Sequence, residues 1–298
     1  MLPKITLFGE SYGMYKLTIV VEVTLIPFIL LFIRKRYGHT ALKAFLYGLL
    51  TLGFGVFALH MTSIMANAIL LKVSNGAFHA HETISSFGYW IFMPPLFLAF
   101  SALFCVDFRK LSDFTCPCIC FVSSTGKLAC FFNGCCEGPK DPQGIYMVNL
   151  GYKVFPVQLY EAILYAVILV ICLVLMYTFS KKHEGYLMPI TGILFAISKI
   201  WAESYRTWPS EWETNFLNSG HTYWQFFELI TLFGCIIWLI AAIVCEKKGK
   251  MPQFATNPLQ RKVKAVMEEK FPKKSATKTT QKNGANHKKK KKKKKGKK

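Results

Sequence analysis

Charged residues are scarce in this chain of 298 residues. Asp, Glu, Lys and Arg together make up 18% of it, whereas 52% of the residues are hydrophobic and 15% are aromatic. Soluble domains ordinarily carry about 25% charged residues. The composition therefore excludes an ordinary soluble domain. Several apolar runs also exceed the ~18 residues that mark a candidate membrane-spanning helix, so we expect a multi-pass membrane protein.

The features of a cleavable signal peptide and of a large extramembrane domain are also missing. The first apolar run, after Lys16, contains Glu22 and Pro27, ends in a basic triplet at 34–36 and has no small-residue cleavage site. We therefore expect it to be retained as the first span. No polar stretch between the apolar runs resembles a catalytic domain of its own. Any active site must then be built from membrane helices and their loops.

Acidic residues are almost absent from residues 247–298, which hold 21 lysines and arginines but only Glu268 and Glu269. Residues 1–246 hold 16 basic and 14 acidic residues, so most of the net charge of +21 belongs to this tail. The pattern predicts a membrane domain at 1–246 and a disordered polybasic cytoplasmic tail at 247–298. The tail is either simply solvated or attracted to anionic lipid of the inner leaflet, at ~1 kcal/mol per basic residue near the surface. No folded motif indicates a specific nucleic-acid partner.

The apolar runs predict an all-α integral membrane protein with about seven transmembrane helices. Each run is close to the ~20 residues that cross the hydrocarbon core. The placement of Lys and Arg predicts an N-terminus outside and a C-terminus in the cytoplasm. Polar residues dilute the fourth run, so a re-entrant helix, leaving six spans, is the alternative there. The expected spans are 15–33, 44–70, 84–106, 113–134, 158–179, 186–206 and 222–245.

Polar residues gather at the predicted outer ends of several spans. Lys199 and Glu203 are four residues apart and Glu203 and Arg206 three apart, so all three lie on one helix face. They form either an ion network within one helix or, together with Lys127 and Glu161 at similar depth, a shared site. Charges inside a membrane are costly and indicate function by default. The excess of cations favours binding of an anionic lipid headgroup or stabilisation of a phosphate leaving group.

Several motifs together resemble one family. TGKLACFFNGCCEG, followed about twenty residues later by FPVQLYEAI, resembles the prolipoprotein diacylglyceryl transferase family. The likeness is to its cysteine-bearing, divergent branch, with a signature near GRIGCFLxGCCYG and a downstream HPTQLYE. SKIWAESYR resembles the family's RFxxEFxR helix, GHTYWQFFELITLFG its last span, and SYGMYKL its SYGLM segment. The resemblance covers about residues 8–245, and the seven-span, N-outside topology that it implies agrees with the one predicted from charge.

The resemblance implies an enzyme of lipoprotein biosynthesis in the cell membrane, with its active site facing the outer side. Such an enzyme transfers the diacylglyceryl group of phosphatidylglycerol to the lipobox cysteine thiol of a prolipoprotein and releases glycerol phosphate. The resemblance implies no metal and no organic cofactor. The alternative is a non-catalytic or altered-substrate membrane protein of the same fold that binds or transports phospholipid.

The resemblance also assigns roles to residues. Lys127 and Lys199 occupy the positions of the family's two essential arginines, and a lysine binds phosphate only as a point charge, without the two-pronged geometry of guanidinium. The family's histidine-containing stretch in the third span is replaced by residues 86–89, and His79 and His81 nearby are expected only to be solvated. The expected catalytic residues are Lys127, Lys199, Glu203 and Arg206. The expected substrate-binding residues are Tyr12, Asn133, Gly134, Gly138, Gln158, Tyr160 and Glu161.

Ten cysteines raise the question of a metal site. A zinc site that joins the cysteines at 116–120 to those at 135–136 is excluded, because the helix between them separates the groups by ~25 Å. Most of the cysteines are expected to pack as small apolar side chains. Cys130, Cys135 and Cys136 are the exception. They are candidates for a disulfide or a reactive thiol on the oxidising side of the membrane.

Overall fold

The computed structural model describes residues 4–7, 10–73, 87–104, 106–180, 183–207, 221–248 and 266, with the side chains of 4–12, 70, 73 and 87 left out. The chain divides into two units, Met1–Thr256 and Asn257–Lys298. In the second unit the description is limited to Val266, so the predicted polybasic tail lies outside the described residues. The same holds for His79, His81 and Cys105. All the elements below belong to the first unit.

Within the described residues, each of the seven expected ranges contains one helix. Five of these helices (α1, α2, α4, α5 and α8) are long and apolar enough to cross a membrane, whereas α3 and α6 are shorter. The chain is therefore a multi-pass membrane protein, and seven crossings with the N-terminus outside remain a prediction. The helices are α1 Met14–Ile33, α2 Ala41–Val73, α3 Phe87–Phe104, α4 Phe108–Asn133, α5 Val157–Thr178, α6 Leu187–Glu203 and α8 Tyr223–Lys247, with a 3-10 turn at Arg34–Tyr37.

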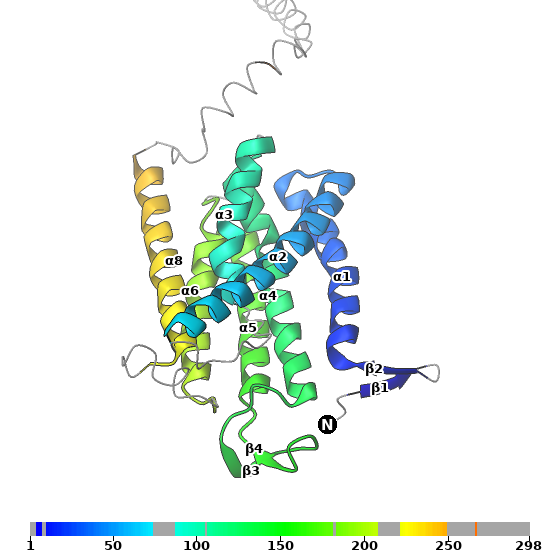
Figure 1. Ribbon diagram of the computed structural model, residues 1–298. Helices are drawn as coiled ribbons and strands as arrows, with labels where there is room; N and C mark the ends of the chain where they lie inside the picture. Colours follow the sequence, from blue (N-terminus) through cyan, green and yellow to red (C-terminus); the bar gives the residue numbers. More distant parts are fainter. Residues whose placement is uncertain are drawn as a thin grey trace, which may run out of the picture. The chain divides into compact units, whose positions relative to one another are not determined.

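Helix α4 is the centre of the packing. It contacts α1, α2, α3, α5 and α6, most extensively α5 (Figure 1). In its most apolar stretch 56% of the residues are buried inside the protein, against 22–33% for the other four long helices. Because protein rather than lipid surrounds α4, its cysteines, serines and threonines can be accommodated there. This explains why hydropathy alone marked the fourth span as the weakest.

The two ends of α4 are defined by specific residues. At its start, the side chain of Asp107 accepts a hydrogen bond of 3.0 Å from the backbone N–H of Arg109, which caps the helix. At its end, Gly134 adopts a φ of +66°, and its N–H bonds back to the carbonyls of Cys130 and Phe131. Such a left-handed cap favours glycine. The chain therefore leaves α4 sharply, at the start of the Gly-flanked loop.

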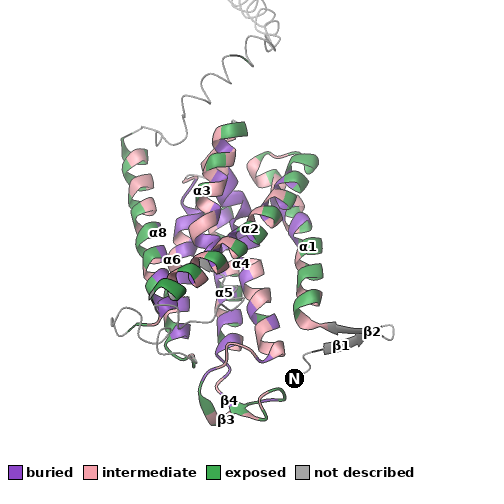
Figure 2. Cartoon of the chain, viewed as in Figure 1, coloured by how far each residue is buried: buried purple, intermediate pink, exposed green. Residues whose placement is uncertain are grey.

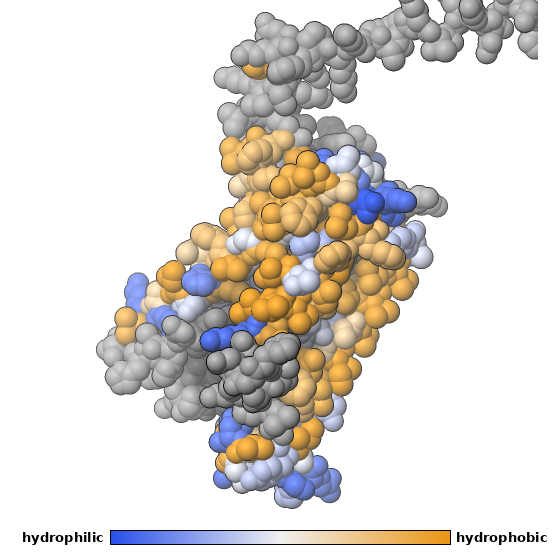
Figure 3. All heavy atoms as spheres, turned by 90° about the vertical axis from the view of Figure 1, so that its right-hand side faces the viewer, coloured by the Kyte–Doolittle hydropathy of each residue, from blue (hydrophilic) through white to orange (hydrophobic). Residues whose placement is uncertain are grey.

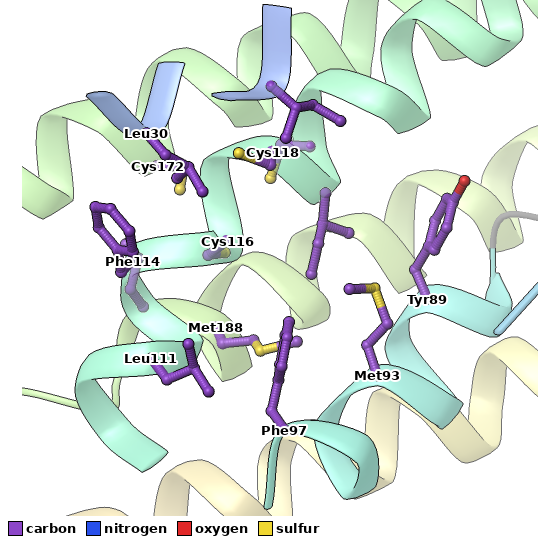
Figure 4. Packing of buried hydrophobic residues seen from close by; sticks show 14 of the residues in the cluster. Leu30, Tyr89, Met93, Phe97, Leu111, Phe114, Cys116, Cys118, Cys172 and Met188 are labelled. Atoms are coloured by element: carbon purple, nitrogen blue, oxygen red, sulfur yellow. The ribbon is translucent and has the colours of Figure 1, made fainter. Parts of the chain in front are cut away.

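Apolar side chains form both the interior and much of the exterior. Buried residues of α1, α2, α3, α4, α5 and α6 make one core, in which Phe97, Phe114 and Met188 pack beside Cys116 and Cys172 (Figures 2 and 4). Large apolar side chains also lie exposed along the outer faces of the long helices, and hydrophobic residues cover much of the face shown in Figure 3. An apolar exterior of this extent is expected of a protein that contacts lipid.

Two short hairpins were not predicted from the sequence. β1 (Lys4–Leu7) pairs antiparallel with β2 (Glu10–Gly13) just before α1, and β3 (Lys140–Met147) pairs antiparallel with β4 (Tyr152–Val154) between α4 and α5. Both lie at the same end of the bundle (Figure 1). Pro and Gly residues in the second hairpin gave it the composition of a loop, which hid its strands.

Candidate functional site

Five charged side chains meet inside the bundle. They are Lys127 of α4, Glu161 of α5, Lys199 and Glu203 of α6, and Arg206, three residues beyond α6. Their side chains are between 0% and 10% exposed. We call these five residues the ion network. Sequence analysis selected all five, and the structure brings them together.

Glu161 is the hub of the ion network. Its Oε2 lies 3.2 Å from Nζ of Lys127, and its Oε1 lies 3.0 Å from Nζ of Lys199. Arg206 donates a hydrogen bond from Nη2 to Oε2. The hydroxyl of Tyr165, one turn further along α5, donates a hydrogen bond of 3.1 Å to Oε1. One buried carboxylate therefore holds three cations, which originate from α4, from α6 and from the segment after α6.

Glu203 makes the second set of contacts. Lys199 donates a hydrogen bond to its Oε1, and Nη1 of Arg206 lies 2.7 Å from the same oxygen. Lys199 and Glu203 lie one turn apart on α6, as expected from their spacing. Arg206 was expected on the same helix face, but α6 ends at Glu203, so Arg206 reaches the carboxylate from the segment after the helix. A network confined to one helix explains only part of the arrangement, because Glu161 joins these residues to α4 and α5.

The charges of the ion network do not balance. Three cations face two carboxylates, an excess of one positive charge. Among the described residues, Lys127 contacts one carboxylate, whereas Lys199 and Arg206 each contact two. Of the three cations, Lys127 is therefore the least neutralised and the best able to bind a further anion.

Glu228 of α8 is a residue near the ion network that sequence analysis missed. It is 0% exposed, and neither of its carboxylate oxygens has a hydrogen-bond partner among the described residues. It lies within electrostatic range of Lys199 and Lys127. Its signal was present in the sequence as a lone acid in the apolar run FFELITLF, since an ionisable residue inside a span is a functional candidate by default. Ionised Glu228 balances the three cations, and protonated Glu228 leaves the excess in place.

Three of the expected substrate-binding residues fix the course of the loop 134–138. Gly134 supplies the left-handed turn. A Cβ atom at Gly138 would lie 2.7 Å from the carbonyl oxygen of Phe155, so there is room only for glycine. Gln158 is fully buried and donates a hydrogen bond of 2.5 Å from Nε2 to the carbonyl oxygen of Cys135. Their observed contacts position the loop beside the ion network.

Asn133 and Tyr160 contact other parts of the protein than the ion network. The Asn133 amide donates to the carbonyl oxygen of Ala129, 2.9 Å away, within its own helix. Tyr160 is 43% exposed, and its ring stacks on that of Phe155 with 5.1 Å between centroids. Tyr12 pairs with Ile5 in the first hairpin, and its side chain lies outside the described part. The contacts described for Asn133 and Tyr160 therefore lie outside the ion network.

Three cysteines gather at the end of α4 without forming a disulfide. We call Cys130, Cys135 and Cys136 the outer cysteines, after the side of the membrane on which the sequence predicts them. The sulfur atoms of Cys130, Cys135 and Cys136 all lie within 4.8 Å of one another, and each thiol is free. The hydroxyl of Tyr15, in the first turn of α1, lies 3.0 Å from Sγ of Cys130 and 2.9 Å from Sγ of Cys135. The start of α1 is thereby in contact with the loop that follows α4.

Comparison with known proteins identifies the family. A family model described as prolipoprotein diacylglyceryl transferase matches residues 14–245. The chain belongs to this family. It is also similar to phosphatidylglycerol--prolipoprotein diacylglyceryl transferase 1 of Clostridium perfringens (strain 13 / Type A), with 24% identity over 157 residues. That match covers 49% of this chain and 56% of the relative, so the chain spans only about half the length of the relative that it matches. The family expected from the motifs is confirmed.

Proposed function

We propose that this protein transfers the diacylglyceryl group of phosphatidylglycerol to the cysteine thiol of a lipobox in prolipoproteins and releases glycerol phosphate. The observation that carries the proposal is the buried ion network, in which Lys127, Lys199 and Arg206 converge on Glu161. Its excess of positive charge lies inside a membrane protein of the transferase family. The named relative carries the same activity in its name.

The bonds that change in this reaction require cations near the phosphate. A carbon–sulfur bond forms between the thiol sulfur and the terminal carbon of the diacylglyceryl group. The bond from that carbon to the phosphate oxygen breaks, its electron pair stays on the oxygen, and the thiol loses its proton. The phosphodiester of the lipid carries one negative charge, and the departing monoester gains a second. Cations placed at that oxygen stabilise the developing charge more than they stabilise the bound lipid, which is the requirement for catalysis.

The contacts of each residue indicate its role in this scheme. Lys127 has one carboxylate contact to exchange for phosphate, so it binds the headgroup. Lys199 lies beside it and adds a second positive charge. Glu161 and Glu203 keep the cations at fixed positions, and Arg206 bridges both carboxylates. Gln158, Gly134 and Gly138 hold the loop that covers this end of the bundle.

The orientation in the membrane is part of the proposal. The distribution of basic residues supports seven crossings with the N-terminus outside and the tail in the cytoplasm. α1 begins and α8 ends at opposite ends of the bundle, which agrees with an odd number of crossings (Figure 1). Lys127 lies six residues before the end of α4, or about 9 Å at ~1.5 Å per residue. The site would then open near the outer leaflet, and the polybasic tail would lie against anionic lipid of the inner leaflet.

The test is direct transfer in membranes that contain the full chain. Radiolabelled phosphatidylglycerol is supplied with a lipobox peptide, and mass spectrometry of the peptide checks for the added diacylglyceryl group. A peptide with serine in place of the lipobox cysteine serves as the control. Transfer to the cysteine peptide alone supports the proposal. Saturable binding of phosphatidylglycerol without any transfer would support the alternative, a phospholipid-binding or transporting member of the fold or one with another lipid donor.

A further inference from the structure

The cluster of Cys130, Cys135 and Cys136 has the form of a metal site that the proposed reaction does not use. Its three sulfur atoms lie within 4.8 Å of one another. Zinc holds thiolates at about 2.3 Å, which places the sulfur atoms of a tetrahedral site about 3.8 Å apart. Small side-chain rotations are therefore enough to bring the three sulfurs to the distances of a bound ion.

The backbone of the loop is held in a form that brings these sulfurs together. Cys136 has a φ of +59°, and it is the one residue other than glycine with a positive φ in the described part of the chain. That conformation is uncommon for a residue with a side chain, and it persists only where the surroundings impose it. Here the turn at Gly134 precedes it, and Gln158 holds the carbonyl of Cys135. The surroundings thus hold the backbone of Cys136 in a strained conformation, and this conformation determines where its sulfur lies.

We propose that Cys130, Cys135 and Cys136 bind one thiophilic d10 metal ion, zinc or copper(I), as three thiolates. Soft thiolate ligands select these ions over harder cations. Each thiol loses its proton on binding, so occupation of the site releases three protons. Three thiolates around Zn²⁺ carry a net charge of −1. Lys127, one helical turn before Cys130, supplies a neighbouring positive charge.

The hydroxyl of Tyr15 lies 3.0 Å from Sγ of Cys130 and 2.9 Å from Sγ of Cys135, which makes it the candidate for the fourth ligand that tetrahedral zinc requires. A bound ion would therefore tie the start of α1 to the loop after α4, directly beside the ion network. Copper(I) needs no fourth ligand. Tyr15→Phe therefore distinguishes the two ions. It should lower the affinity for zinc and leave the affinity for copper(I) unchanged.

A second group of cysteines supplies a matched control. The sulfurs of Cys116, Cys120 and Cys172 also lie within 4.8 Å of one another, but these residues are 0–2% exposed within the apolar core. Figure 4 shows Cys116 and Cys172 there. Sγ of Cys116 is already in hydrogen-bond contact with the hydroxyl of Thr191, 2.9 Å away. The outer cysteines are only partly buried, so an ion can reach them. A metal site needs an entry path as well as ligands.

The experiment uses the full chain, purified in detergent under reducing conditions without chelator. It is titrated with Cd²⁺, and the sulfur-to-cadmium charge-transfer absorption and the bound metal per chain are measured. We expect one Cd²⁺ per chain. Cys135→Ser and Cys136→Ser should each lower the affinity at least about tenfold, since even outer-shell changes at metal sites cost that much. Cys172→Ser should leave the titration unchanged.

Protection of the wild-type thiols from alkylation makes the test independent of how the variants fold. Bound Cd²⁺ should shield Cys130, Cys135 and Cys136 from iodoacetamide, as read from the masses of their peptides. Alkylation at equal rates with and without metal would overturn the proposal. So would titrations in which Cys172→Ser, and not the outer variants, removes the absorption. Recovery of two outer cysteines as a disulfide that blocks metal binding in untreated membranes would identify a redox pair instead.

Discussion

Lys127 of α4 and Glu161 of α5 form a buried ion pair, with 3.2 Å between Nζ and Oε2. Through this pair α4 shares one carboxylate with Lys199 of α6 and with Arg206. The pair does two things at once. It neutralises a lysine that would otherwise be costly inside a membrane, and under the proposed function it holds that lysine where a phosphate displaces the carboxylate.

The first prediction concerns the charge at position 127. Lys127→Gln keeps the side chain polar and close in length but removes its charge. Because it then no longer stabilises the departing phosphate, transfer of the diacylglyceryl group should fall at least about 100-fold. Lys127→Arg should keep the rate within about tenfold of the wild type, since guanidinium binds phosphate in two-pronged fashion. The measurement is single-turnover transfer to a lipobox peptide.

Lys140→Gln is the matched control for that prediction. Lys140 lies exposed in β3, and its ammonium group is 4.6 Å from the centroid of the Tyr152 ring, away from the carboxylates of the ion network. Its substitution should leave the transfer rate unchanged. Equal losses in Lys127→Gln and Lys140→Gln would argue against a specific role for the buried lysine.

The second prediction concerns Glu161. Glu161→Gln removes the negative charge that faces three buried cations, so the variant keeps the shape but leaves those charges uncompensated. Breaking a buried pair in this way costs roughly 3–5 kcal/mol. The thermal midpoint of the detergent-solubilised protein should fall accordingly. Glu184→Gln is the control, because Glu184 pairs with Lys110 at 3.5 Å at the partly exposed surface, where such pairs contribute about 0–1 kcal/mol. Similar midpoints for both variants would contradict the assignment of Glu161 as the hub.

The third prediction concerns Glu228. Its carboxylate is buried without a hydrogen-bond partner in the described part of the structure, so Glu228→Gln breaks no hydrogen bond there. If Glu228 is ionised, the substitution removes a negative charge near the ion network, and the KM for phosphatidylglycerol should fall. If Glu228 is protonated, the KM should stay unchanged, and in neither case should stability decrease. Glu22→Gln is the control, because Glu22 lies on α1 and accepts a hydrogen bond of 2.6 Å from Thr125. A raised KM in Glu228→Gln alone would show that Glu228 assists binding of the lipid.

The fourth prediction compares two glycines. Gly138→Ala places a Cβ atom 2.7 Å from the carbonyl oxygen of Phe155 and 2.8 Å from Val157, so the loop must shift and both stability and transfer should fall. At Gly126, inside α4, nothing lies within 4 Å of an added Cβ. Gly126→Ala should therefore raise stability, by about 0.5–1 kcal/mol, because alanine favours the helix. Thermal unfolding of the two variants and the wild type shows whether each substitution raises or lowers stability. A stabilising effect of Gly138→Ala would contradict the observed packing.

Much of the fold could be predicted because the membrane restricts what a chain can do. Every backbone polar group in lipid must be satisfied internally, so a run of ~20 apolar residues has few alternatives to a helix. The contact between Lys199 and Glu203 also follows from spacing alone, because both lie on α6. The sharing of Glu161 depends instead on how α4 and α5 are rotated about their axes. Their sequences do not determine this, since α5 is apolar on most of its faces.

The contacts that were missed have no local signal. Tyr15 reaches Cys135 across 120 residues of sequence, and nothing in the segment around Tyr15 indicates that partner. Glu228 differs from Tyr15, because a lone acid in an apolar run is itself a local signal. Its position near Lys199 and Lys127, however, depends on how α8 packs against the other helices. The positions of the helices therefore followed from the local sequence. The contacts between helices that form the site required the three-dimensional structure.

The last prediction concerns pH and His39, which lies outside the membrane-spanning segments, between the turn at 34–37 and α2. Burial, with Lys43 and Lys110 nearby, lowers the pKa of His39 to about 4, below its ordinary value near 6.5. Its ring packs edge-on against Phe114, with 4.8 Å between centroids.

As the pH falls below about 6.5, the unfolded chain takes up the proton first. The stability due to neutral His39 is therefore complete above pH ~6.5, is lost as the pH falls, and levels off below pH ~4. His39→Phe should remove this slope. Thermal midpoints of both proteins between pH 7 and pH 4 test it: their difference should change with pH, and parallel curves would show that His39 does not titrate on unfolding.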